Sequence, residues 1–173
     1  MSTLTVKELA APTGYDLKIA SGETLDLKSQ GTVTMPAGSV LQVVQSSYDT
    51  SVSTTSDSSY TDTGLAATIT PSATSSKILV RINQSGCHVS SSGTDIDLIL
   101  LRGSTEIAQM AGLFMEGLTT GNLIISNEWL DSPSTTSATT YKTQFRIGDD
   151  AGTVKVQNGS YGTSVITLME VAG

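Results

Sequence analysis

The chain has one cysteine and one histidine, and they are neighbours, Cys87 and His88, so a thiol and imidazole pair is the first chemistry to test. They belong to a polar, turn-rich stretch, residues 87–93, that we expect to link two strands. A catalytic pair must face each other, whereas consecutive residues of an extended chain point to opposite sides. Zinc needs about four ligands, more than this pair supplies unless copies share a site at a trimer axis. We therefore predict no catalytic residue and no metal ligand here.

Two acidic pairs could bind a hard cation through their carboxylate oxygens. Asp95 and Asp97 are two residues apart, so on a strand they face the same way. Asp149 and Asp150 stand between glycines, where they could bind Ca²⁺. Simpler interpretations explain both pairs. Asp95 and Asp97 fit solvated acids beside an apolar strand, and Asp149 and Asp150 fit turn residues. We favour these interpretations and predict neither a metal nor another cofactor.

Three aromatic residues, Trp129, Tyr141 and Phe145, could line a carbohydrate groove. Aromatic residues make up only 5% of the chain, so we expect these three to pack in the core. The sequence contains no nucleophile-elbow, phosphate-loop or dinucleotide-binding glycine pattern. We predict that the chain is not an enzyme.

The overall composition excludes several classes of partner. The formal net charge is −7 and the few Lys and Arg residues form no cluster, so nothing displaces counterions from nucleic acid or an anionic membrane. We find neither a run of about 18 apolar residues nor a basic start followed by an apolar block. We therefore expect no membrane span, no secretory signal and assembly in a cytoplasm. One cysteine cannot form an intramolecular disulfide, so packing and assembly must supply stability.

A repeated order of short apolar run, polar turn and next apolar run predicts an all-β fold. Pro71 lacks a backbone donor and should end a strand at Thr70; after a turn, residues 78–82 form a central strand. Eight to ten strands, roughly ten residues apart, predict an antiparallel two-sheet sandwich of the jelly-roll type. Residues 48–59 form either a loop or an exposed edge strand, and residues 108–118 fit a strand better than a short helix. The other expected strands span residues 39–45, 60–70, 96–101, 122–130, 141–145, 154–156 and 164–171.

The strand at residues 96–101 is apolar on both faces. A sandwich buries only the inner face of each sheet, so the outer face of this strand needs a further cover. The C-terminal strand, residues 164–171, is also strongly apolar. We predict a homotrimer in which neighbouring subunits cover these surfaces.

Residues 1–37 differ from the rest of the chain in the spacing of their apolar residues. Their apolar residues come in alternating pairs separated by glycine turns: Leu17 and Ile19, Leu25 and Leu27, Val33 and Met35. Strands this short are marginal in an isolated monomer. We predict an N-terminal β-arm over residues 1–37, used for docking and trimerisation, and a sandwich domain over residues 38–173. An ordinary edge hairpin or a disordered arm is the alternative.

Several segments resemble small virion proteins of tailed bacteriophages, especially marine and cyanobacterial ones. They are residues 35–45, 60–65 continuing to 69–71, 75–80 and 166–172, and residues 19–25 resemble the short repeats that precede such domains in phage fibres. The likeness spans most of the chain, and its motifs are structural. It implies a jelly roll of the tumour-necrosis-factor or C1q type, usually a trimer at the virion surface.

The resemblance predicts a non-enzymatic structural protein of the phage virion, a homotrimer that decorates or cements the capsid or a head appendage. Its partners would be sister copies and capsid or other virion proteins, with no nucleic acid and no membrane. It would lie at the virion surface after assembly in the host cytoplasm. The alternative is a short tail fibre or adhesin whose jelly roll binds a host receptor. The short repetitive stretch favours the capsid, and a secreted hydrolase or lectin has hardly any support.

Overall fold

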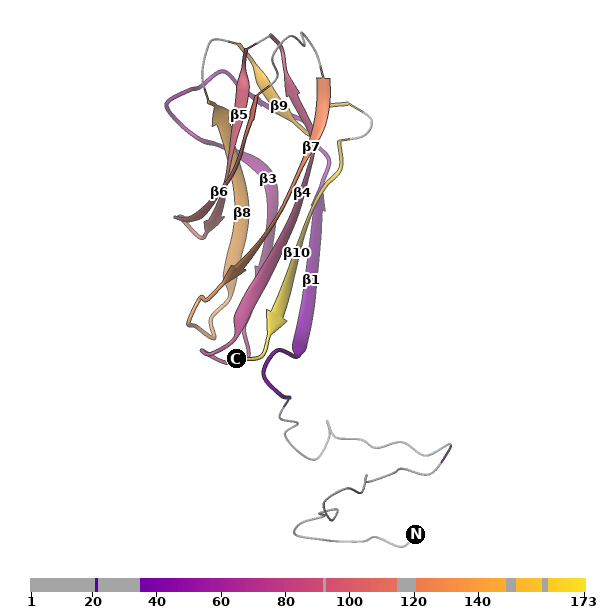
Figure 1. The fold of residues 1–173 in the computed structure, drawn as a ribbon, viewed down its shortest axis with the longest axis vertical. Coiled ribbons are helices and arrows are strands. Elements are labelled where there is room, and N and C mark those ends of the chain that lie inside the picture. Colours follow the sequence, from indigo (N-terminus) through magenta and orange to yellow (C-terminus); the bar gives the residue numbers. More distant parts are fainter. Residues whose placement is uncertain (1–20, 22–34, 92, 115–120, 149–151, 160–161) are drawn as a thin grey trace, which may run out of the picture. The chain divides into compact units, whose positions relative to one another are not determined.

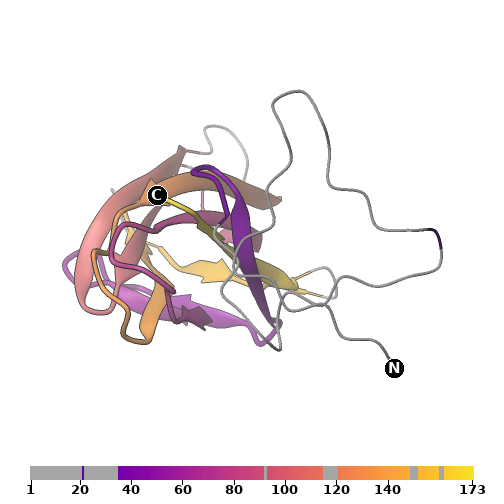
Figure 2. The same ribbon diagram turned by 90° about the horizontal axis from the view of Figure 1, so that it is seen from below.

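The protein is described by a computed structural model, which covers residue 21 and residues 35–91, 93–114, 121–148, 152–159 and 162–173. Residues 1–37, predicted to form the docking arm, lie almost entirely outside this description. All regular structure among the described residues is β, in two antiparallel sheets packed face to face (Figures 1 and 2). The predicted all-β sandwich is confirmed. None of the described residues forms a helix long and apolar enough to cross a membrane.

The larger sheet, sheet A, contains six strands and has β4 at its centre. One side of β4 pairs with β10 and, near its end, with β9, while the other side pairs with β7. Strand β10 continues to β1, and β9 continues to β2. The bounds are β1 Val40–Tyr48, β2 Val52–Thr54, β4 Lys77–Val89, β7 Gly121–Asp131, β9 Val154–Val156 and β10 Ser164–Val171.

The smaller sheet, sheet B, has four strands in the order β3-β8-β5-β6. The bounds are β3 Thr61–Ile69, β5 Asp95–Arg102, β6 Thr105–Phe114 and β8 Thr139–Ile147. Strand β3 stops two residues before Pro71, and β4 starts after the turn, as predicted. Residues 52–54 form the edge strand β2, and residues 108–114 belong to a strand and not to a helix.

The predicted link at residues 87–93 is wrong in its first three residues, which extend β4 to Val89. A bulge between Gln84 and Cys87 shifts the register, and Gly86 has a φ of 60°, which favours glycine. After the bulge, Cys87 and Val89 are buried in the core. The polar residues that suggested a link instead alternate with buried ones.

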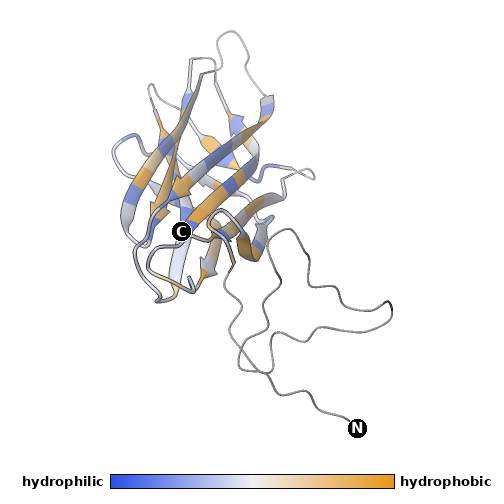
Figure 3. Ribbon diagram, turned by 60° about the horizontal axis from the view of Figure 1, so that its bottom comes forward, coloured by the Kyte–Doolittle hydropathy of each residue, from blue (hydrophilic) through white to orange (hydrophobic). Residues whose placement is uncertain are grey.

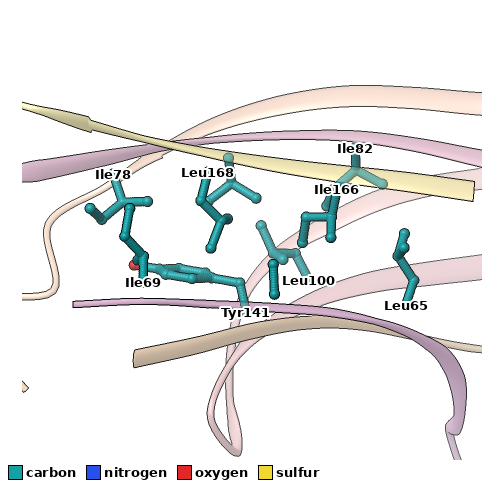
Figure 4. Close-up of a cluster of buried hydrophobic side chains, with 10 residues drawn as sticks. Leu65, Ile69, Ile78, Ile82, Leu100, Tyr141, Ile166 and Leu168 are labelled. Atoms are coloured by element: carbon teal, nitrogen blue, oxygen red, sulfur yellow. The ribbon is translucent and has the colours of Figure 1, made fainter. Parts of the chain in front are cut away.

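The core consists of two apolar clusters between the sheets. The first contains side chains from β3, β4, β5, β8 and β10, and Figure 4 shows the side chains of the two sheets meeting. The second surrounds Phe145 on β8 and Cys87 on β4. Burying one large aliphatic side chain contributes about 1.5–3 kcal/mol, so these clusters are the main source of stability. The labelled members of the first cluster are Leu65, Ile69, Ile78, Ile82, Leu100, Tyr141, Ile166 and Leu168.

A buried polar layer crosses the core, because Thr143 and Gln84 stand on their strands between members of the two clusters. The hydroxyl oxygens of Thr63 and Thr143 are 2.6 Å apart, and Thr143 Oγ1 donates to Gln84 Oε1 at 3.1 Å. Gln84 Nε2 then donates to Ser164 Oγ at 2.9 Å. The layer therefore links sheet B to sheet A through hydrogen bonds.

The outer face of β5 does not need the neighbouring subunit that we predicted for it. Ile99 and Leu101 are only 3% and 6% exposed in the single chain. Their cross-strand neighbours on β8 are Gln144 and Lys142, and both of these side chains reach Asp62 on β3. The prediction failed because the single chain already buries both apolar side chains.

Candidate interaction surface

The outer face of sheet A carries a row of apolar side chains that crosses four strands. Val43 on β1 is opposite Met169 on β10, Met169 is opposite Leu79 on β4, and Leu79 is opposite Leu130 on β7. We call these four residues the apolar row. The end members, Val43 and Leu130, are 57% and 51% exposed. Figure 3 shows apolar and polar bands alternating along the strands.

The polar part of the same face lies beside the apolar row. Arg81 Nε on β4 is 2.6 Å from Glu128 Oε1 on β7, and both side chains are more than half exposed. This pair lines an open hollow of about 520 Å³ together with polar residues such as Asn83, Ser126 and Thr167. An exposed ion pair contributes at most about 1 kcal/mol. The hollow offers polar contacts, while the apolar row offers burial energy.

A smaller hollow of about 180 Å³ opens between β6 and β7. Val80, Ile82 and Leu100 line it from the core strands, and Trp129 lines it from β7. Asn127 Nδ2 on β7 donates to the Met110 carbonyl on β6 at 3.1 Å and ties the two edge strands together. A mostly apolar hollow of this size suits one apolar side chain or ring.

The aromatic residues divide into two groups. Tyr141 and Phe145 are fully buried, as predicted, whereas Trp129 is 45% exposed beside the smaller hollow. The prediction of core packing is wrong for Trp129 because β7 is an edge strand, where an inward side chain reaches the open side of the sandwich.

Cys87 and His88 are not brought together. The Cys87 thiol is buried in the core, where burial raises its pKa to about 12, and its Sγ donates to the Gln84 carbonyl at 3.3 Å. His88 is the next residue of the strand and points the other way. Burial and, secondarily, the charge of Lys155 lower the pKa of His88. A protonated thiol beyond reach of the imidazole is not a nucleophile at neutral pH.

Asp97 already has a cationic partner in the chain. The Arg146 Nη2 and Nε atoms donate to Asp97 Oδ2 at 3.0 and 3.1 Å, and the guanidinium lies 4.8 Å from the centre of the Tyr60 ring. The Asp95 carboxylate lies against the backbone of Gly148. Asp149 and Asp150 lie outside the described residues. In the part of the chain that is described, no three His, Cys, Asp or Glu side chains group to hold a metal.

Glu170 is a buried carboxylate on β10 that was not among the residues predicted to matter. It accepts hydrogen bonds of 2.6 Å from the Ser72 backbone N, the Ser72 hydroxyl, the Ser76 hydroxyl and Gln42 Nε2. Burial opposes its ionisation, but these hydrogen bonds outweigh burial and lower its pKa to about 2. The signal was present in the sequence, because Glu170 follows Ser164, Ile166 and Leu168 at every second position, on the buried face.

A second buried carboxylate, Asp131 at the end of β7, joins the two sheets. Arg102 Nη1 on β5 donates to both of its oxygens, at 2.9 and 2.8 Å, and the Tyr141 hydroxyl on β8 donates to Oδ2 at 2.7 Å. Burial, followed by the hydrogen bond and charge of Asp131, raises the pKa of Tyr141. Both carboxylates are satisfied within the chain, so their observed contacts are structural.

Comparison with known proteins gives no family. No protein-family model and no curated protein sequence matches the chain. Among solved structures, the chain resembles the VP2 subviral particle of infectious bursal disease virus, with a TM-score of 0.44, 16% identity and coverage of 94% of this chain. It also resembles the D431N mutant VP2 protein of the same virus in T=1 particles, with a TM-score of 0.39, 16% identity and 87% coverage.

This chain spans about two fifths of the length of the matched chains, 41% in both cases. A likeness at this level concerns the arrangement of strands. We draw no function from it.

Proposed function

We propose that the chain is a non-enzymatic structural protein of a phage virion, assembling as a homotrimer that decorates or cements the capsid or a head appendage. The observation that carries the proposal is the apolar row, which a lone sandwich leaves partly in water. Exposed apolar surface that continues across several strands is typical of an interaction site. The resemblance of several segments to tailed-phage virion proteins supplies the class of particle.

The apolar row offers enough burial energy for assembly. Complete burial of one Val, Leu or Met side chain contributes about 1.5–3 kcal/mol, and part of this remains available at each of the four positions. Association costs about 4–15 kcal/mol, so the four partial contributions need the further apolar side chains at the edges of sheet A. Val40, for example, is 53% exposed next to the row. A stable trimer therefore requires most of this face to be buried.

The N-terminal arm, residues 1–37, is the proposed docking element. Its apolar pairs need partner strands from sister chains or from the particle surface. The arm has three lysines, Lys7, Lys18 and Lys28, against four acids, and so carries only one of the seven net negative charges. A nearly neutral arm approaches an acidic particle surface more readily than the sandwich does.

The test adds purified protein to particles that lack it. We expect the full-length chain to sediment as a trimer and to bind particles, and we expect residues 38–173 to remain folded by circular dichroism but not to bind. Equal binding of the truncated protein would show that the sandwich is the attachment surface. Binding to host cells in place of particles would favour the tail-fibre or adhesin alternative.

A further inference from the structure

The exposed large apolar side chains gather at the two opposite edges of sheet A. Strands β1 and β7 form these edges, with β10 and β4 between them (Figure 1). Eight such side chains occur among the described residues, and each lies on one of these strands or just before β1. They are Met35, Val40, Leu41 and Val43 at the β1 edge and Leu123, Ile124, Trp129 and Leu130 at the β7 edge.

Neither edge strand contains a lysine, a proline or a charge without an ion-pair partner. Strand β1 has no charged residue. Strand β7 has two acids, but Glu128 pairs with Arg81 and Asp131 pairs with Arg102. Natural sheets protect free edges with lysines, prolines or inward-pointing charges. Two long unprotected edges on one sheet indicate that both contact something.

A second copy of the chain explains why there are two such edges. Three identical subunits around an axis form a closed ring only through a heterologous contact, in which one patch meets a different patch of the next copy. A two-fold dimer formed edge to edge would use one edge twice and leave the other edge in water. A heterologous contact between the two edges buries both edges of every copy when it closes into a ring.

The strand directions agree with this arrangement. Each step from β1 to β10, β4 and β7 is antiparallel, so β1 and β7 run in opposite directions. Rotation about an axis parallel to the strands keeps those directions, and β1 of one copy then meets β7 of the next copy antiparallel. Val43 and Leu130 belong to the same row, so the rotation brings them to about the same height.

We propose that the β1 edge of one copy contacts the β7 edge of the next, closing a ring of three with the apolar row facing the axis. The proposal rests on the homotrimer of the proposed function and specifies its interface. The hollow beside Trp129, of about 180 Å³, accepts an apolar side chain of the neighbouring β1. A half-exposed tryptophan beside an apolar hollow is a typical centre of binding energy at an interface.

The test is cross-linking of the full-length chain with a short bismaleimide at two introduced thiols, Val43→Cys and Leu130→Cys. The native Cys87 is buried and stays unreactive. Within one chain the two positions are three strand spacings, about 14 Å, apart, so a shorter reagent does not bridge them. We expect the double variant to give covalent dimers and trimers on a denaturing gel, and each single variant to stay monomeric there. The matched control combines Leu130→Cys with Thr68→Cys, an exposed position on β3 of sheet B, and should not cross-link.

Ultracentrifugation of the same samples separates the two hypotheses. Self-cross-linking of a single variant, or a trimer whose double variant fails to cross-link, would overturn the edge-to-edge contact while leaving the homotrimer intact. A monomer at micromolar concentration would overturn both. Leu130→Asp should raise the concentration at which the trimer dissociates by about tenfold or more, and Thr68→Asp should not.

Discussion

The outer faces of the two sheets both carry apolar side chains, but they differ in how far the single chain covers them. On sheet B, Ile99 and Leu101 are buried within the single chain, and two acids of that sheet are paired, Asp97 with Arg146 and Asp62 with Lys142. On sheet A, the apolar row has no such cover, and its ends are more than half exposed. Both faces are built from alternating strands, so alternation does not distinguish a self-covered face from one that needs a partner. The exposure of the apolar side chains in the single chain does.

The sharpest test of this contrast replaces one apolar residue on each outer face by alanine. Ile99→Ala on sheet B should lower the free energy of unfolding by about 2–5 kcal/mol, because a buried side chain is lost. Val43→Ala on sheet A should change it by less than about 0.5 kcal/mol under conditions where the chain is monomeric. Urea denaturation of the monomer measures both. Equal losses would mean that the two faces are covered to the same extent.

A smaller effect on stability concerns Glu170 on β10, which accepts hydrogen bonds from Ser72 and Ser76 in the turn between β3 and β4. The folded pKa of Glu170 is about 2, below its ordinary value of 4.5, so its ionised form stabilises the fold. This stability is present above about pH 4.5 and is lost as the pH falls towards 2, by about 3 kcal/mol in total. Glu170→Gln should remove most of this dependence. Thermal unfolding at several pH values measures it, and an unchanged acid profile in the variant would contradict the assignment.

The smallest effects compare one ion pair on each outer face. Asp97→Ala should cost about 1–3 kcal/mol, because it leaves Arg146 without its partner on a half-buried face. Glu128→Ala should cost less than about 1 kcal/mol, because its pair with Arg81 is largely in water. Raising the salt concentration should diminish the second difference more than the first. If Glu128→Ala proved the costlier change, the polar part of sheet A would be tighter than its exposure indicates.

Much of the fold could be predicted from the sequence, because period-2 alternation and Pro71 mark the strands and the turn between β3 and β4. The link at residues 87–93 was misread because a bulge changes the alternation within β4, which polar composition does not reveal. The apolar surface was predicted on the outer face of β5, whereas the exposed large apolar side chains lie on β7 and on or just before β1. Apolar residues on both faces of β5 indicated burial, but the sequence did not reveal that the single chain itself buries Ile99 and Leu101. The exposed edges could not be predicted without the order of the strands.

The polar layer in the middle of the core has a consequence for how the two sheets can be aligned. An apolar side chain can contact various apolar neighbours, whereas a buried hydrogen bond needs a particular partner at a particular position. Here, displacing β8 by two residues along β4 would take the Thr143 hydroxyl away from Gln84 and leave the Gln84 Oε1 atom without its donor. Leaving such a buried group unsatisfied costs about 1–3 kcal/mol, which disfavours the displaced alignment. Because Thr143 reaches Gln84 in one register, the polar layer selects the relative alignment of the two sheets.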